Sequence, residues 1–330
     1  MGYFSVLFHN NDTIEIKDPP EISDSIKDLN IDQIIESITL YKQEYNLKPF
    51  FYFPLHDISL IKYRQEIMRD IENQDLFNAL VSFAEGMIKV RKYLSNSNKY
   101  YYKLQKQRWL LDAAGLYCEY IQKLNGDLSE INLNSDGLNE FREYLKGYVT
   151  SSQFVSLVRE IKNIQLNLSN VKYSLLIRDN TISVRNYSQE PNYQIEIEKT
   201  FAKFQQDSKK SYLYEFGYDN EMNHIEAAII EYVSQIYPEV FNTLSSFSKA
   251  HQNFQDPTIT IFDREIQFYI SYLEYTRRFR KSGYHFCYPE MTREKNIFSK
   301  SCFDLALAKN LYNEKKRIIR NDFFLKDKER

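Results

Sequence analysis

The sequence predicts a mainly α-helical fold with one small β-hairpin and a short, truncated α/β segment at its C-terminal end. Apolar residues recur at helical spacing over most of the 330 residues. Only 8 Gly and 8 Pro occur, so few tight turns are expected and long helices are favoured. Hydrophobic residues make up 43% of the chain and aromatic residues 15%, which supplies enough apolar surface for a sizeable core.

The first half of the chain is expected to be helical after a weakly alternating edge strand at residues 2–8. The helical spacing of Ile34, Ile35, Ile38 and Tyr41 predicts a helix that starts at Ile31 and ends before Lys48. A second helix is predicted from Asp57, whose carboxylate suits the start of a helix. Further apolar stripes predict helices over 77–88, 101–123 and 138–148, with loops at Gly126 and at 134–137.

The period of the apolar pattern changes in the middle of the chain. Helical spacing continues over residues 154–168 and then gives way to two β-rich runs, 173–178 and 181–185. Asp179 and Asn180 separate the runs, and their side chains tolerate positive φ. The sequence therefore predicts a β-hairpin over residues 173–185.

Long helices are expected again after the hairpin. One stripe runs from Ile225 to Phe247 and must be kinked or interrupted at Pro238. The pair Asp256 and Pro257 has the residue types preferred at an N-cap and at the first helical position. The last part of the chain predicts a strand over 284–288, a helix over 301–308 and a strand over 317–325.

The net charge of −2 conceals a strong asymmetry between the two ends. Residues 1–40 hold eight Asp and Glu against two Lys, whereas residues 277–330 hold fifteen Lys and Arg against seven Asp and Glu. A basic segment suits phosphate binding, and it equally suits a solvated face or a join to further sequence. Three widely spaced cysteines predict reduced thiols, and the lack of a leader or a long apolar run predicts a cytoplasmic protein without a membrane partner.

No motif for catalysis is present in the sequence. A P-loop requires G-x-x-x-x-G-K-[ST], and none of the eight glycines provides that spacing, so the chain is not expected to be an enzyme by itself. The His224-Ile225-Glu226 triplet lacks the cysteine pair of a zinc deaminase, and no metal site is expected. The aromatic runs 50–53 and 100–102 could stack on bases, although helix packing explains them better.

Several short segments resemble the MutS family of DNA mismatch repair ATPases, in particular a small bacterial branch of it. Their order along the chain carries the resemblance, which extends from about residue 50 to 325. The segments are Tyr63–Asp70, Phe83–Met87, Asn220–His224, Phe262–Glu265, Phe303–Ala308 and Ile318–Leu325. Residues 1–49 are too short for the family's mismatch-reading domain and lack its Phe-x-Glu motif, so mismatch recognition is not implied.

The resemblance implies a domain order. It consists of an N-terminal lead segment (1–49), a helical core and lever (50–150), a clamp-like insertion with the hairpin (151–220), long lever helices (221–283) and the beginning of a truncated ATPase domain (284–330). The full-length parent would be a homodimeric, DNA-dependent ATPase that uses ATP and Mg, whereas this chain would hold no cofactor. The function implied for the chain is to grip double-stranded DNA non-specifically for DNA repair and to couple the clamp to the ATPase domain.

Candidate DNA-binding residues follow from charge and position around the hairpin. Residues 151–215 contain nine Lys and Arg against seven Asp and Glu, and the candidates are Lys172, Arg178, Arg185, Lys209 and Lys210. By resemblance, Asn321 would neighbour the nucleotide site of the parent, although Ile318 replaces the aromatic residue common in the family. The alternative is a helical protein-interaction scaffold that does not bind DNA.

Overall fold

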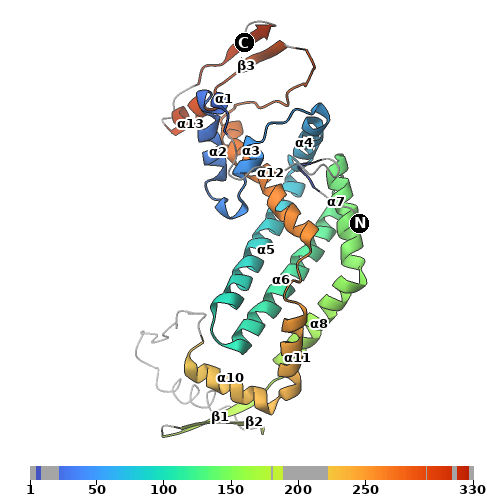
Figure 1. Ribbon diagram of the computed structural model, residues 1–330, viewed down its shortest axis with the longest axis vertical. Coiled ribbons are helices and arrows are strands. Elements are labelled where there is room, and N and C mark those ends of the chain that lie inside the picture. The colour runs from blue at the N-terminus through green and yellow to red at the C-terminus, as the bar shows by residue number, and fades with distance from the viewer. Residues whose placement is uncertain are drawn as a thin grey trace, which may run out of the picture. The chain divides into compact units, whose positions relative to one another are not determined.

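The computed structural model describes residues 5–8, 22–179, 181–188, 222–294, 296–313 and 318–326 (Figure 1). Within them the fold is mainly α with a small β-hairpin, which confirms the predicted fold class. The elements are α1 (Asp24–Asp28), α2 (Ile31–Thr39), η1 (Gln43–Tyr45), α3 (Lys48–Tyr52), α4 (Ile58–Ile71), α5 (Gln74–Lys99), α6 (Lys103–Glu130), α7 (Asp136–Thr150), α8 (Ser152–Ser169), β1 (Tyr173–Arg178), β2 (Thr181–Asn186), α10 (His224–Ile236), α11 (Pro238–Ala250), α12 (Pro257–Lys281), β3 (Asn296–Cys302), α13 (Leu305–Asn313) and β4 (Asn321–Lys326).

The chain forms two compact units, and each is built from separate stretches of sequence. Unit 1 comprises residues 1–87, 120–149 and 255–330. Unit 2 comprises residues 88–119 and 150–254, and therefore contains the β1–β2 hairpin. None of the helices in the described ranges is long and apolar enough to cross a membrane.

Two helix starts in unit 1 confirm the positions predicted from acidic N-caps. Asp57 accepts a hydrogen bond from the Ser59 backbone N–H at 2.9 Å and begins α4. Asp256 accepts one from the Ile259 backbone N–H at 3.0 Å and begins α12, with Pro257 at the first helical position. Such side chains satisfy N–H groups that have no partner inside the helix, so both starts are readable from local sequence.

Three phenylalanines join α5, α7 and α12 in the core of unit 1. The Phe141 and Phe262 rings stack with their centroids 3.5 Å apart, and Phe83 lies 5.9 Å from Phe262. The carboxylate of Asp70, on α4, accepts hydrogen bonds from the backbone N–H groups of Asn134 and Ser135 at 2.9 Å and 2.7 Å. These bonds tie the turn before α7 to α4, so the aromatic and polar contacts together hold α4, α5, α7 and α12.

Residues Ser5–Phe8 do not form the edge strand that their alternation predicted. They are buried and make bends, and side chains satisfy their backbone. The Ser5 hydroxyl accepts hydrogen bonds from the backbone N–H groups of Leu7 and Phe8, at 3.1 Å and 3.0 Å. The prediction was wrong because apolar alternation marks burial, and these residues are buried against helices rather than beside another strand.

The helices of unit 2 also follow their local signals. Asn223 and Glu226 form a capping box at the start of α10. Pro238 stands at the first position of α11, which confirms that the long predicted stripe is interrupted there. Gly115 of α6 lies close to α8, because a Cβ at this position would be 3.6 Å from Cγ2 of Ile161. That distance is an ordinary van der Waals contact, so α6 and α8 could accommodate a Cβ beside Ile161.

The predicted hairpin is confirmed, and the C-terminal elements differ from the prediction. β1 pairs antiparallel with β2, with Tyr173 opposite Asn186 and Arg178 opposite Thr181. Residues 284–288 form no strand, because the Tyr284 and Phe286 rings instead pack on Phe303 at 5.0 Å and 5.5 Å. Strand β3 occupies residues 296–302, so the helix predicted from residue 301 begins only at 305. Residues 301 and 302 belong to β3, which pairs with β4.

Glycine placement in the long helices generates a stability prediction. Gly86 lies against the Tyr120 ring, where an added Cβ would overlap the ring atoms, whereas Gly126 has no atom within 4 Å of that position. Gly126 also lies inside α6, whereas the sequence predicted a loop at this position. Gly86→Ala is expected to lower the free energy of unfolding by about 1–3 kcal/mol through overpacking. Gly126→Ala is expected to raise it by about 0.5–1 kcal/mol, because alanine loses less backbone entropy in a helix.

Urea unfolding followed by far-UV circular dichroism measures both changes, and Gly126→Ala is the matched control for Gly86→Ala. Equal unfolding midpoints for the two variants would contradict the close approach of α5 and α6 at Gly86.

Candidate nucleic-acid interface

Two arginines share one face of the β1–β2 hairpin. Successive side chains of a strand point to opposite faces, so Ser174, Leu176 and Arg178 lie on one face of β1. Ser174 is opposite Arg185 and Arg178 is opposite Thr181 in the antiparallel register. Arg178 and Arg185 therefore lie on the same face, near opposite ends of the hairpin, and both are exposed.

The spacing of these arginines suits a nucleic-acid backbone. Four residue steps separate Arg178 from the residue opposite Arg185, which corresponds to about 13 Å along the strand. The major groove of B-form DNA is about 12 Å wide. Two guanidinium groups at this spacing can reach phosphates on either side of one groove, and a two-stranded ribbon holds them apart.

The other predicted residue of the hairpin, Lys172, precedes β1 and is exposed. Its ammonium group lies 6.0 Å from the centroid of the Tyr187 ring, and its backbone carbonyl accepts a hydrogen bond from the Tyr237 hydroxyl at 2.5 Å. Tyr237 lies between α10 and α11, so this bond anchors the base of the hairpin to the helices of unit 2. The ammonium group remains available to a phosphate.

The remaining predicted site residues are Lys209, Lys210 and Asn321. Lys209 and Lys210 lie outside the described residues. Asn321 begins β4 in unit 1, where its backbone carbonyl accepts a hydrogen bond from the Cys302 thiol at 2.9 Å. Ile318 is only 4% exposed and belongs to an apolar cluster with Phe279. An aliphatic residue at this position therefore serves the core of unit 1.

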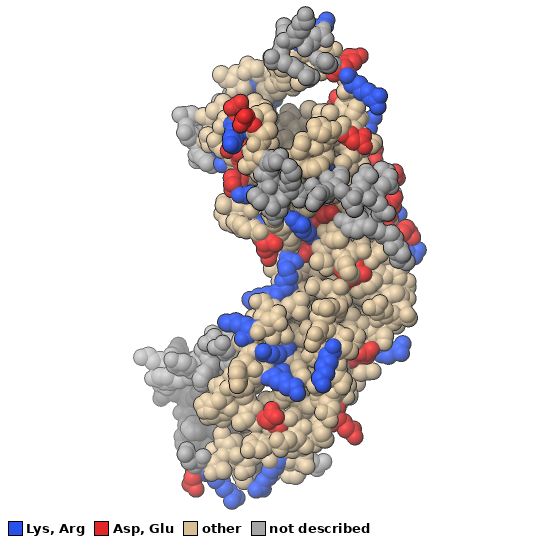
Figure 2. Space-filling model, viewed as in Figure 1, with Lys and Arg blue, Asp and Glu red and all other residues tan. Residues whose placement is uncertain are grey.

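A second basic surface, at the end of α5 and the start of α6, was missed in the sequence. Its signal was readable, because residues 88–111 contain seven Lys and Arg and no Asp or Glu. Lys and Arg side chains gather on this part of the face drawn in Figure 2. The seven residues are Lys89, Arg91, Lys92, Lys99, Lys103, Lys106 and Arg108.

A cavity of about 440 Å³ lies within unit 2, between the hairpin and the helices. Its walls are mostly apolar and include Trp109 of α6, Tyr173 of β1 and Val233 of α10. Arg108 also lines it and pairs with Asp112 at 2.8 Å. The cavity therefore combines mostly apolar walls with an ion pair between two residues that line it.

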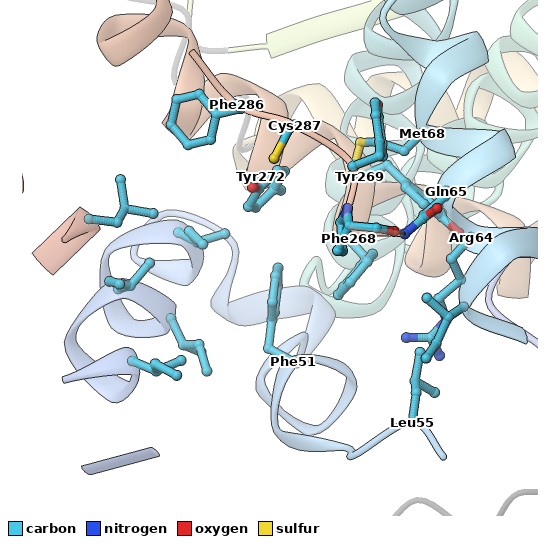
Figure 3. A pocket seen from close by; sticks show the side chains of 18 of the residues that line it. Phe51, Leu55, Arg64, Gln65, Met68, Phe268, Tyr269, Tyr272, Phe286 and Cys287 are labelled. Atoms are coloured by element: carbon cyan, nitrogen blue, oxygen red, sulfur yellow. Dashed lines mark hydrogen bonds between the residues drawn. The ribbon is translucent and has the colours of Figure 1, made fainter. Parts of the chain in front are cut away.

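A second cavity, of about 460 Å³, lies within unit 1 (Figure 3). Aromatic side chains of α3 and α12, including Phe51, Phe268 and Tyr272, project towards it. Three polar side chains of its lining, Arg64, Gln65 and Arg280, already make structural hydrogen bonds, and Arg280 Nη2 donates to Glu72 at 2.7 Å. Arg64 Nε donates to the Leu7 carbonyl at 2.8 Å, and Gln65 Nε2 donates to the Pro289 carbonyl at 3.0 Å. This cavity is thus a largely apolar space beside a hydrogen-bonded core.

Glu265 is the strongest electrostatic feature of that core. The side chain lies on α12 and the residue is 3% exposed. Its carboxylate accepts hydrogen bonds from the Ser5 hydroxyl at 2.8 Å and from the Val6 backbone N–H at 2.9 Å. Burial raises the pKa of Glu265 from 4.5 to about 7, although these hydrogen bonds and the charge of Arg64 act in the opposite direction.

The comparisons with known proteins identify no relative. No protein-family model matches the chain, and no curated protein or solved structure matches it. In the portion of the chain that the structure describes, no group of three or more His, Cys, Asp or Glu could hold a metal ion.

The raised pKa of Glu265 predicts that stability falls as the pH rises. Between about pH 4.5 and 7 the folded chain retains a proton that the unfolded chain has lost, so the free energy of unfolding decreases over this window and levels off above it. The decrease is expected to reach at most about 3 kcal/mol. Glu265→Gln, which cannot ionise, is expected to remove this slope in urea unfolding measured across the window.

Glu66, an exposed carboxylate on α4, provides the control substitution, and Glu66→Gln is expected to retain the slope. The idea fails if Glu265→Gln and the unsubstituted chain lose stability in parallel as the pH rises.

Proposed function

We propose that this chain is the DNA-holding part of a MutS-like repair protein and that it grips duplex DNA non-specifically through phosphates. The observation that carries the proposal is the pair Arg178 and Arg185, which share one face of an exposed hairpin at a groove-wide spacing. Lys172 adds a third exposed cation at the base of the same hairpin. Arginine and lysine on phosphates give affinity without sequence information, which is the behaviour expected of a clamp.

The charge around the hairpin sets the expected strength. Residues 171–188 carry three basic side chains and one acidic side chain, Asp179. A surface with so few phosphate contacts is expected to bind at the weak end of the non-specific range, about 10⁻⁴ M at physiological salt. A second copy of the hairpin, in the homodimer proposed for the parent protein, would increase the effective affinity by engaging the same duplex twice.

The hypothesis of a MutS-like parent is supported by the order of the motifs along the chain. It is also supported by the helical fold, which carries the β1–β2 hairpin between α8 and α10. In this reading the parent is a cytoplasmic protein that adds an ATPase domain with ATP and Mg, and the chain couples the clamp to that domain. Asn321 would then neighbour the nucleotide. The alternative, a protein-interaction scaffold, makes no phosphate contacts. The salt dependence of duplex binding therefore distinguishes the DNA clamp from the scaffold.

Replacing Lys172, Arg178 and Arg185 together with Ala is expected to weaken duplex binding to a similar extent on unrelated sequences. The slope of log affinity against log salt concentration is expected to fall by about 3, because each lost phosphate contact releases about one counterion fewer. Fluorescence anisotropy of a labelled duplex over a salt series measures both quantities, with far-UV circular dichroism unchanged.

A matched triple variant, Lys27→Ala with Lys62→Ala and Lys281→Ala, removes three exposed lysines from unit 1 and is expected to leave the slope unaltered. An unaltered slope in the hairpin variant as well would remove the hairpin from the DNA surface and favour the scaffold.

A further inference from the structure

The turn between α5 and α6 carries the highest density of positive charge in the described part of unit 2. Residues 88–111 contain seven Lys and Arg and no Asp, Glu or His. At about 100° per residue, Lys89, Lys92 and Lys99 fall within about 80° of one another on α5. Lys103 and Lys106 are three residues apart on α6 and share a face there. These five lysines are thus grouped on one side of each helix, whereas Arg91 and Arg108 lie on other faces.

Four of these lysines are not neutralised by acidic partners. Arg108 pairs with Asp112, whereas no ion pair joins Lys92, Lys99, Lys103 or Lys106 to a described carboxylate. Lys92, Lys99 and Lys103 are exposed, and Lys106 is partly buried. Because unpaired cations close together repel one another, a surface of this kind gains most from an anionic partner that bridges them.

Aromatic packing fixes the turn that carries these lysines. The Trp109 ring meets Tyr93 edge-on at 4.7 Å and stacks with Tyr100 at 5.9 Å. Tyr100 is 7% exposed, so it serves the packing of the turn. The Ser97 hydroxyl donates to the Lys106 carbonyl at 2.9 Å and ties α5 to α6. The surface is therefore presented by a rigid support, which reduces the entropy lost on binding.

The next residue, Tyr101, has the opposite environment. It is 88% exposed, and its ring makes a T-shaped contact with the neighbouring Tyr102 ring, with the centroids 5.4 Å apart. Lys99 and Lys103 flank it in the sequence, and both are exposed. An exposed ring between cations is the arrangement on which unpaired bases stack while phosphates contact the cations. Paired bases stack on each other inside a duplex and leave no face for such a ring.

We propose that the α5–α6 turn is a binding site for single-stranded nucleic acid, with Tyr101 stacking on a base and Lys99 and Lys103 contacting the flanking phosphates. This site goes beyond the duplex grip proposed for the hairpin, because it involves other residues and another form of nucleic acid. Lys92 and Lys106 extend the basic path along the two helices. A nucleic acid with a single strand next to a duplex would contact both the α5–α6 turn and the hairpin of unit 2.

The test measures binding of a labelled oligothymidylate of about 20 nucleotides to the purified chain by fluorescence anisotropy. Tyr101→Ala is expected to weaken this binding roughly 5- to 150-fold, which is the range for loss of one stacked base. Tyr101→Phe retains the ring and is expected to bind like the unsubstituted chain. Lys99→Ala with Lys103→Ala is expected to lower the salt slope by about 1.4, since each single-strand contact contributes about 0.7.

Tyr41 supplies the matched control, because it is 87% exposed and lies in unit 1. Tyr41→Ala is expected to leave oligothymidylate binding unchanged, and Tyr101→Ala is expected to leave duplex binding unchanged. Both tyrosines are solvent-exposed, so neither variant removes core packing, and far-UV circular dichroism checks that each is folded.

The two proposals fail separately. The triple hairpin variant is expected to lose duplex binding and to keep oligothymidylate binding, so an unaffected duplex affinity there overturns only the duplex grip. The single-strand site is overturned if the unsubstituted chain does not bind oligothymidylate, or if Tyr101→Ala binds it as tightly as the unsubstituted chain. It is also overturned if Tyr101→Ala weakens duplex binding and single-strand binding equally. Binding of the chain to anionic lipid vesicles through these lysines, in place of oligothymidylate, would overturn it as well.

Discussion

The packing of unit 1 depends on a buried backbone that has no strand partner. Residues Ser5–Phe8 are buried, so their polar groups must be satisfied by the protein itself. The hydroxyls of Tyr63 and Tyr269 donate to the carbonyls of Ser5 and Val6, and Arg64 Nε donates to that of Leu7. An unmade hydrogen bond in this environment costs about 1–3 kcal/mol, so α4 and α12 must stay where their side chains reach this segment.

The same requirement explains why charged groups are retained in that core. Arg64 lies over the rings of Phe8 and Phe268, with its guanidinium carbon 5.0 Å and 5.6 Å from their centroids. The positive charge lowers the pKa of the neighbouring Glu265, and desolvation of that carboxyl outweighs this effect. Aromatic faces compensate a guanidinium for lost water better than aliphatic side chains do, because their quadrupole is negative at the face.

Features set by neighbouring residues could be predicted, and those set by distant contacts could not. Asp57, Pro238 and the pair Asp256–Pro257 fix helix boundaries through their own capping or ring geometry, and each boundary was predicted correctly. Residues 5–8 and 284–288 have the apolar content of strands, but their conformation depends on contacts with distant residues such as Glu265 and Phe303. Glycine is also ambiguous in sequence, since Gly126 continues α6 whereas Gly283 adopts a φ of +82° after α12.

The candidate interface also has one part that the local sequence predicts and one part that it does not. The hairpin was predictable from the change of period, and its register places Arg178 with Arg185 on one face. The aromatic run 100–102 does not by itself predict the surface at the α5–α6 turn, because its members look alike in sequence. Its members differ in the fold, since Tyr100 is buried against Trp109 whereas Tyr101 is exposed. The absence of acidic residues over 88–111 was the local signal, and a net charge near zero for the whole chain obscured it.

Charge is distributed between the units in a way that favours unit 2 as the nucleic-acid-binding part. Unit 1 contains 26 Lys and Arg against 31 Asp and Glu, whereas unit 2 contains 17 against 14. The net charges are therefore −5 for unit 1 and +3 for unit 2, and charges act strongly on a polyanion only within a screening length of about 8 Å at physiological salt. Because screening is so short, the local groups decide binding. Both the hairpin and the α5–α6 turn are local concentrations of cations in unit 2, and Trp109 and Tyr173, one from each surface, line the same cavity. The two surfaces therefore share one packed support.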